Sequence, residues 1–301
     1  MTGLGALIRR NTKLYFRDRG MFFTSLITPL ILLELYGTFL SNVYEETFRG
    51  ALEAAGAAAS DRLIGGCVGG ELASSLLAVS CVTVAFCSNL LMVQDKITGA
   101  RQDLTIAPVR PGTLALGYYL STLLSTLLIC LVATAACLGY LLHAGWFLTA
   151  GDVAALLLDV ALLVLFGTAL SSCVNFFLST NGQASAVGTI ISAGYGFVCG
   201  AYMPISQFSK GLQRVISFLP GTYGTSLLRN HALRGAFEEM IAQGFPGEVV
   251  EAIRDSVDCN LYFFGSRVEP GQMYFVLAAS IAIAIGLYVA MNILRGWKRR
   301  G

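Results

Sequence analysis

Charged residues are scarce in this chain of 301 residues: only 13% are Asp, Glu, Lys or Arg, whereas 55% are hydrophobic and the mean hydropathy is +0.68. A soluble domain needs about 25% charged residues to cover its surface. The deficit excludes a soluble globular protein. Strict alternation of apolar and polar residues is also absent, which argues against a membrane β-barrel. The sequence therefore predicts an integral membrane protein built of helices.

Catalytic motifs are absent as well. No G-x-x-x-x-G-K-[ST] stretch occurs, so nucleotide binding by a P-loop is excluded. Neither H-E-x-x-H nor G-x-S-x-G occurs, and the two histidines, His143 and His231, have no cluster of partners near them in the sequence. The eight cysteines form no C-x-x-C pair, which argues against a metal site. We therefore expect no catalytic residue, no metal and no cofactor in this chain, and no nucleic-acid partner.

Long apolar runs are what the sequence has instead. A helix needs about 20 apolar residues to cross a bilayer. We expect an all-α membrane protein that forms one domain over residues 1–301, with six transmembrane helices. The predicted spans are about 21–41, 66–93, 113–141, 152–178, 183–203 and 272–294.

Two segments outside these spans also have helical periodicity. Residues 2–19 place apolar side chains on one face and basic ones on the other, which predicts an amphipathic helix in the headgroup plane. The alternative is a disordered basic tail. Residues 204–271 are the longest segment outside the spans, and their pattern predicts short exterior or re-entrant helices at 208–219, 232–243 and 248–257.

The basic residues predict the orientation of the chain. Twelve of the 20 Lys and Arg lie in the two terminal segments and in the loop after the second span, together with three acids. By the positive-inside rule, both termini and this loop lie in the cytoplasm. The twelve are Arg9, Arg10, Lys13, Arg17, Arg19, Lys96, Arg101, Arg110, Arg295, Lys298, Arg299 and Arg300.

Acidic residues inside a span are costly and usually mark a functional interior or a buried pair. Glu34 lies in the first predicted span, and Thr38 follows one turn later on the same face. These two residues could face a substrate path or a subunit interface, or the carboxyl could simply bond to a neighbouring helix. For Asp159, which has apolar neighbours one turn away, we favour a structural role.

A row of small residues runs along the fifth predicted span at intervals of four. Such a row lets another helix approach closely, which stabilises helix packing in lipid. The partner could be a helix of this chain or of a second subunit. The row comprises Ala184, Gly188, Ser192, Gly196 and Gly200.

Residues 95–108 are a polar interruption between the second and third spans. Asp95 is a plausible N-cap for a helix over 96–107, and Pro108 disfavours helical backbone at the residue before it. A short rigid helix with a mixed polar and apolar face, which includes Arg101 and Leu104, suits insertion into a groove on a soluble partner. The alternative is a solvated loop helix.

Two sets of residues give the chain a resemblance to a known family. In the polar loop these are Asp95, Lys96, Gly99, Leu104, Pro108 and Val109. After the fifth span they are Pro204, Pro220, Tyr223 and Arg229, with an amphipathic stretch between the two prolines. In this order they resemble the permease subunits of ABC-2-type exporters, the type V ATP-binding cassette transporters. Asp-Lys replaces the Glu-Arg pair common in that family.

The resemblance implies a function. It implies that 95–108 is a coupling helix for a separate ATPase subunit, which would hold ATP and Mg²⁺, and that a second permease copy or a relative completes the transporter. It also implies export from a bacterial cell of a drug, a peptide or a lipid-like amphiphile. The alternatives are a stand-alone secondary transporter or channel, which should show inverted repeats or several midplane charges, and an intramembrane enzyme.

Overall fold

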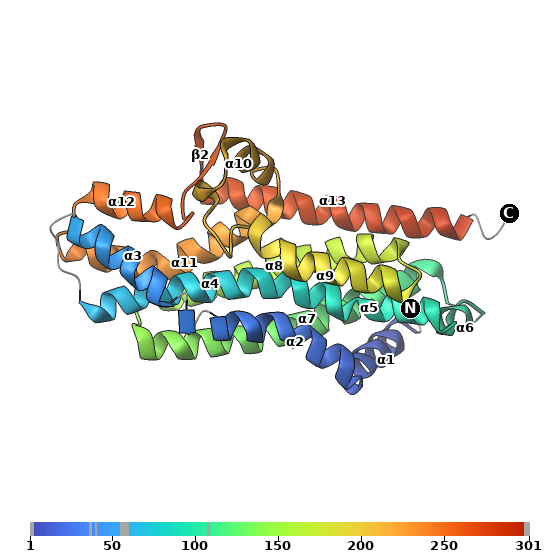
Figure 1. The fold of residues 1–301 in the computed structure, drawn as a ribbon. Coiled ribbons are helices and arrows are strands. Elements are labelled where there is room, and N and C mark those ends of the chain that lie inside the picture. Colours follow the sequence, from blue (N-terminus) through green and yellow to red (C-terminus); the bar gives the residue numbers. More distant parts are fainter. Residues whose placement is uncertain (1–2, 36–37, 40, 55–59, 107–108, 298–301) are drawn as a thin grey trace.

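The structure of the protein is a computed structural model. It describes residues 3–35, 38–39, 41–54, 60–106 and 109–297. Helices run nearly side by side in an elongated bundle (Figure 1). The only strands in the described part of the chain form one short antiparallel hairpin. The all-α prediction is thereby confirmed, with the hairpin as an addition that the sequence pattern did not predict.

The elements, in chain order, are α1 (Leu4–Arg17), α2 (Arg19–Leu35), α3 (Ser41–Ala54), α4 (Asp61–Ser88), α5 (Leu90–Ile97), α6 (Ala100–Ile106), α7 (Pro111–Ala144), α8 (Ala150–Phe177), α9 (Asn181–Val198), the 3₁₀ helix η2 (Ile205–Gln207), α10 (Lys210–Ile216), α11 (Pro220–Ala242), α12 (Gly247–Ser256), β1 (Leu261–Phe263), β2 (Ser266–Val268) and α13 (Pro270–Trp297).

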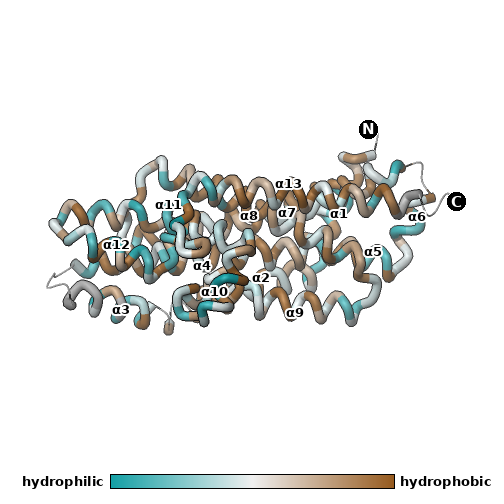
Figure 2. The backbone as a smooth tube through the Cα atoms, turned by 90° about the horizontal axis from the view of Figure 1, so that it is seen from above, coloured by the Kyte–Doolittle hydropathy of each residue, from teal (hydrophilic) through white to brown (hydrophobic). Residues whose placement is uncertain are grey.

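Four helical segments are long and apolar enough to cross a membrane: Asp61–Ile97, which joins α4 and α5, then α7, α8 and Pro270–Leu294 of α13. They correspond to the predicted spans 66–93, 113–141, 152–178 and 272–294. The described part of α2 has 17 residues, and α9 has 18 with many polar and small ones. Neither is among the four, so six spans remain a prediction. Figure 2 shows hydrophobic residues along α7, α8 and α13.

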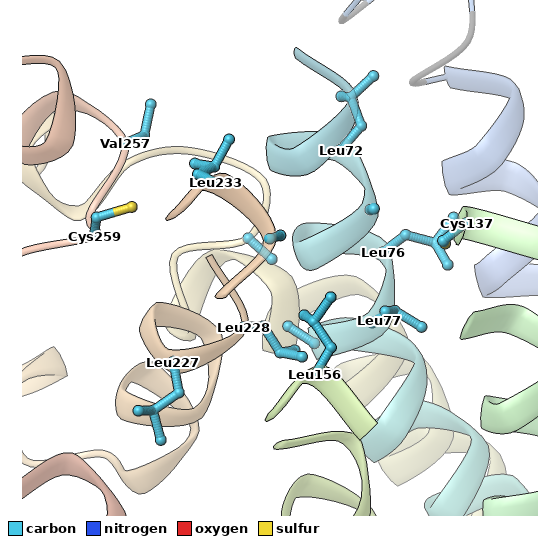
Figure 3. Packing of buried hydrophobic residues seen from close by; sticks show 14 of the residues in the cluster. Leu72, Leu76, Leu77, Cys137, Leu156, Leu227, Leu228, Leu233, Val257 and Cys259 are labelled. Carbon is cyan, nitrogen blue, oxygen red and sulfur yellow. The ribbon is translucent and has the colours of Figure 1, made fainter. Parts of the chain in front are cut away.

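Helix α4 is the centre of the bundle. In its most apolar window 89% of the residues are buried, compared with 22% in α13. Helices α2, α7, α8 and α11 all pack against it. Figure 3 shows Leu77 of α4 near Leu156 of α8 and Leu228 of α11, and Leu76 of α4 near Cys137 of α7. The peripheral helix α13 leaves most of its apolar surface outside, as expected of a lipid-facing helix.

Local sequence signals set several element boundaries. Thr149 and Asp152 form a capping box at the start of α8, in which each side chain bonds to the other's backbone. Pro111 and Pro220 each occupy the first turn of a helix, where a missing N–H costs nothing. In the hairpin, Phe264 and Gly265 both have positive φ angles, 50° and 89°, as a two-residue type I′ turn requires.

The segment between α9 and α13 is more helical than predicted. The helix expected over 232–243 is the second half of α11, which begins at Pro220 and has 23 residues. The helix expected over 208–219 is shorter, because α10 covers only Lys210–Ile216. Helix α12 agrees with the prediction for 248–257. Because α11 packs against α4, α8 and α13, much of this segment belongs to the bundle itself.

The two ends of the bundle differ in what they carry. Helices α1 and α6 lie at the same end as the last turns of α13, whereas α3 and α12 lie at the opposite end (Figure 1). The amphipathic helix predicted over 2–19 is α1, which buries Leu7, Asn11 and Tyr15 and packs along α7. We call the end with α1 and α6 the α6 end, and the other the α12 end.

The close packing of α11 predicts that one of its glycines does not tolerate a larger side chain. A Cβ atom at Gly235 would overlap the backbone carbonyl oxygen of Phe147, in the loop before α8. We expect Gly235→Ala to destabilise the purified protein by about 1–3 kcal/mol, the usual cost of overpacking. Gly286→Ala in α13 is the matched control, because no described atom lies within 4 Å of its added Cβ. Thermal unfolding in detergent measures both; an unfolding temperature of Gly235→Ala at or above wild type would contradict the packing.

Candidate functional site

Arg229 in α11 is the centre of a buried charge network and is 1% exposed. One guanidinium nitrogen, Nη2, lies 2.7 Å from Oε1 of Glu71 in α4, and Nη1 lies 3.2 Å from Oδ2 of Asp258, after α12. Nη2 also donates to the carbonyl of Gly200, at 2.8 Å, and to the hydroxyl of Ser75, at 3.1 Å. One side chain therefore joins α4, α11, the turn after α9 and the segment after α12.

The network contains two carboxyl groups and one guanidinium. Burial raises the pKa of Asp258, and the positive charge of Arg229 opposes that rise. The backbone N–H of Ile205 also donates to the Asp258 carboxylate, at 2.7 Å. In a low-dielectric interior, removing one partner of such a set leaves an uncompensated charge. The network is therefore a strong constraint on how these four segments can move.

Helix α11 makes two further polar contacts with α8. Nδ1 of His231 lies 2.6 Å from Oδ2 of Asp159, and the hydroxyl of Tyr274 in α13 donates to the other oxygen, at 2.6 Å. One turn further on, Nε of Arg234 donates to Oδ1 of Asp152. Asp159 is fully buried and bonded on both oxygens. This placement agrees with the structural role that its sequence context favoured.

The residues of the second motif define the turns that bring Arg229 to this place. Pro204 precedes η2, and Pro220 opens α11. The hydroxyl of Tyr223 donates to the carbonyl of Ser217, so it closes the turn between α10 and α11. Among the described members of this motif, Arg229 alone enters the ion network. The other three shape the backbone around it.

Asp95, at the α6 end, has a different role from the one predicted. It lies inside α5 and does not cap a helix, so the N-cap prediction is wrong. Its carboxylate is 5% exposed and accepts hydrogen bonds from Arg10 of α1, at 2.7 and 3.1 Å, and from the hydroxyl of Tyr118 in α7, at 2.6 Å. The hydrogen bond to Asp95 raises the pKa of Arg10. Asp95 thus fixes α1 and α7 to α5.

Lys96 fixes α5 to a third helix. Its ammonium group donates to the last carbonyls of α8 and the residues after it, those of Asn175, Phe176 and Leu178, at 2.8, 2.8 and 2.7 Å. A cation at a helix C-terminus satisfies these unpaired carbonyls and interacts favourably with the helix dipole. Asp95 and Lys96 therefore face the interior of this chain.

The continuous helix predicted over 96–107 is also wrong. Helix α5 ends at Ile97, Gly99 has a φ of +82°, and α6 covers only Ala100–Ile106. A left-handed backbone at Gly99 ends one helix and starts a new direction. Pro108, the predicted end of the helix, lies outside the described residues.

The side chains of α6 divide into two groups. Leu104 packs on the cluster that contains Leu7 and Tyr118, and Arg101 is partly buried. Ile106, at the tip, is 83% exposed. Of the predicted coupling residues, Arg101 and Leu104 thus turn at least partly toward the chain itself, whereas Ile106, which was not among them, is available to a partner.

A family model described as ABC-2 type transporter matches residues 2–232. The chain belongs to the ABC-2 type transporter family. The matched residues contain α1, both anchors of α5, the helix α6 and Arg229. A comparison with curated proteins finds no match. Membership identifies the chain as a membrane-spanning transport subunit.

The predicted interface residues of this ABC-2 chain fall in two places. Gly188 and Ser192 line a groove of about 610 Å³ between α2 and α9, which we call the α2–α9 groove. Gly196 instead packs under the ring of Tyr202, and Gly200, with a φ of +77°, forms the turn that meets Asp258. Only the first half of the small-residue row therefore faces outward.

Glu34 and Thr38 both lie on the surface of the described chain. The hydroxyl of Thr38 donates to the backbone carbonyl of Glu34, at 2.7 Å. Among the described residues, no group of three His, Cys, Asp or Glu is placed to hold a metal. Glu34 is thus an acid on an outer face, not part of an internal pair.

Two members of the Arg229 network were missed from the sequence. Glu71 lies inside the predicted span 66–93, and an acid within an apolar run is a signal that could have identified it. Asp258 offered no such signal, because it lies in a polar segment after α12. Its pairing with Arg229 depends on how the segment after α12 packs on the bundle.

The network makes a prediction about stability. Arg229→Ala should leave Glu71 and Asp258 unpaired in a dry interior, at a cost of about 3–5 kcal/mol. Arg267→Ala is the matched control, since the side chains of Arg267 and of its partner Glu251 are 41% and 48% exposed and an exposed pair contributes about 0–1 kcal/mol. Thermal unfolding of the purified protein compares them, and equal losses would contradict a central role for Arg229. The double variant Arg229→Met with Glu71→Gln should unfold at a higher temperature than Arg229→Met alone.

Proposed function

We propose that this chain is the permease subunit of an ATP-driven exporter and that a separate ATP-binding cassette subunit drives it. The observation that carries the proposal is α6, a short helix at the end of the bundle with Ile106 83% exposed at its tip. An exposed apolar residue on a polar helix suits a groove on a soluble partner. The chain has no P-loop, so ATP and Mg²⁺ would be bound by that partner.

The anchors of α5 supply a route for the force. Asp95 and Lys96 tie α5 to α1, α7 and α8, and α5 continues α4 as one segment over Asp61–Ile97. A push on α6 would thus reach α4 and the helices around it together. In this proposal Asp95 and Lys96 transmit movement, and Ile106 makes the contact.

A second permease copy would complete the path. The described lining of the α2–α9 groove contains no ionised side chain and several hydroxyl and small residues, including Thr28, Gly188 and Ser192. The exposed carboxyl of Glu34 on α2 would be costly against lipid, and a partner copy or an aqueous path removes that cost. We infer that α2 and α9 are the remaining two of six spans and face this partner.

The lining also bears on the cargo. A groove of apolar and hydroxyl side chains favours an amphiphile, such as a drug, a peptide or a lipid-like molecule, over a polyanion. The distribution of basic residues favours a cytoplasmic position for the α6 end and both termini. The plasma membrane of a bacterial cell is the location that fits this orientation and the family.

Docking through α6 is tested at Ile106. Ile106→Asp should leave membrane insertion and unfolding temperature unchanged, because the side chain contacts little of its own chain. It should abolish co-purification of the ATP-binding cassette subunit and lower ATP hydrolysis of the reconstituted complex, because a carboxylate would be desolvated at the contact. Ile241→Asp, at an isoleucine 58% exposed in the last turn of α11, is the matched control. Full ATP hydrolysis with Ile106→Asp would refute docking at this tip.

The second copy is tested at Gly188. An added Cβ meets no described atom within 4 Å there, so Gly188→Leu fits the single chain while filling the α2–α9 groove. We expect the dimer to be lost while the unfolding temperature of the monomer is kept or raised, because Leu favours helix over Gly. Gly139→Leu in α7, which is equally uncrowded, should leave the dimer intact. Light scattering after size-exclusion chromatography measures the mass of each variant. A dimer that persists in Gly188→Leu would mean that the interface lies elsewhere.

A further inference from the structure

A second cavity, of about 510 Å³, lies apart from the α2–α9 groove and shares no lining residue with it. Helix α10 forms one wall, the segment from the end of α12 through the hairpin forms the other, and the first turn of α11 lies at its base. We call it the α10 pocket. It contains both cationic and anionic side chains, which distinguishes it from the uncharged α2–α9 groove.

The α10 wall of the pocket is cationic. Lys210 and Arg214 lie four residues apart, hence on one face of the helix. Both are exposed, and neither forms an ion pair with an acid in the part of the chain that the structure describes. The guanidinium of Arg214 lies over the ring of Phe264, 5.8 Å from its centroid. These two side chains provide a site for a phosphate group, which lysine and arginine bind through charge-assisted hydrogen bonds.

The opposite wall is acidic and aromatic. Asp255 accepts hydrogen bonds from the side chain of Asn260, at 2.7 Å, and from the hydroxyl of Tyr262, at 3.1 Å. These neutral donors hold the carboxylate in place without neutralising it. The other acid of the pocket, Asp258, is already paired with Arg229. A ligand that spans the pocket thus meets positive charge on one side and negative charge on the other.

The pocket lies at the level where a span begins. Strand β2 ends at Val268, and α13, which is long and apolar enough to cross a membrane, begins at Pro270. Figure 1 shows α10 and β2 beside the first turns of α13. Phe218, Phe263 and Phe264 form an exposed aromatic cluster there, with centroids 4.9–6.0 Å apart. Aromatic residues concentrate at the headgroup level of membranes.

We propose that the α10 pocket binds the headgroup of a zwitterionic phospholipid from the surrounding leaflet. Lys210 and Arg214 hold the phosphate, and Asp255 beside Tyr262 holds the ammonium group. A purely anionic headgroup would place negative charge against Asp255 with no cation between them. The site is separate from the transport path, and the proposal does not depend on coupling to an ATPase.

Native mass spectrometry of the purified full chain tests the site with two lipids of identical tails, phosphatidylethanolamine and phosphatidylglycerol. The wild-type chain should bind the ethanolamine lipid more tightly. Lys210→Ala with Arg214→Ala should weaken its binding about tenfold, because two charge-assisted contacts are lost. Asp255→Asn should weaken the binding of phosphatidylethanolamine. It should leave the binding of phosphatidylglycerol unchanged or make it tighter. Arg267→Gln, an exposed arginine of β2 that does not line the pocket, is the matched control and should change neither.

Three results would overturn the proposal. The first is undiminished ethanolamine-lipid binding by the Lys210→Ala, Arg214→Ala double variant. The second is an equal effect of Asp255→Asn on the binding of both lipids, which would mean that the pocket does not recognise the ammonium group. The third is full competition by inorganic phosphate, which would make it a site for free anions. The thermal unfolding profile of each variant shows that it is folded, and the substituted side chains are all exposed.

Discussion

The buried guanidinium of Arg229 is the interaction on which the α12 end of this transporter depends. A charge without solvent must keep its partners, so Glu71, Asp258 and the carbonyl of Gly200 have to stay within hydrogen-bond reach. These partners belong to the central helix, the segment after α12 and the turn after α9. The segment after α12 is consequently fixed to the core of the bundle, although its own sequence is polar.

The α6 end has its own set of fixed contacts, and a single helical segment joins the two ends. Asp95 and Lys96 hold α5 against three helices, while Glu71 holds α4 near the other end. Because 89% of the apolar window in this segment is buried, it cannot slide independently of its neighbours. Any movement introduced at α6 is therefore shared by a group of helices, and Gly99 is the one described position near α6 where the backbone changes hand.

Local properties of the sequence were predicted well, and long-range ones were not. Long apolar runs depend on neighbouring residues, so the spans 66–93 and 113–141 could be located. The start of α11 at Pro220 was not predicted, because it lies between the helices expected over 208–219 and 232–243. Asp95 was misassigned because a polar residue after an apolar run resembles a cap, whereas its partner Arg10 lies far away in the sequence. The hairpin was missed because its strands have three residues each, too few to show alternation.

The pairing of Glu71 with Arg229 also sets an order of assembly. Glu71 belongs to an early helix, and Arg229 to a late one, so a ribosome delivers the acid to the membrane long before its counterion. Helices α7, α8 and α11, which bury α4, are likewise all made after it. The central helix thus reaches its final environment only when the second half of the chain has been inserted. A chain that ends before Arg229 would leave the Glu71 carboxyl without its partner inside the bilayer. Membrane quality control can recognise an unfinished protein by such an unpaired acid.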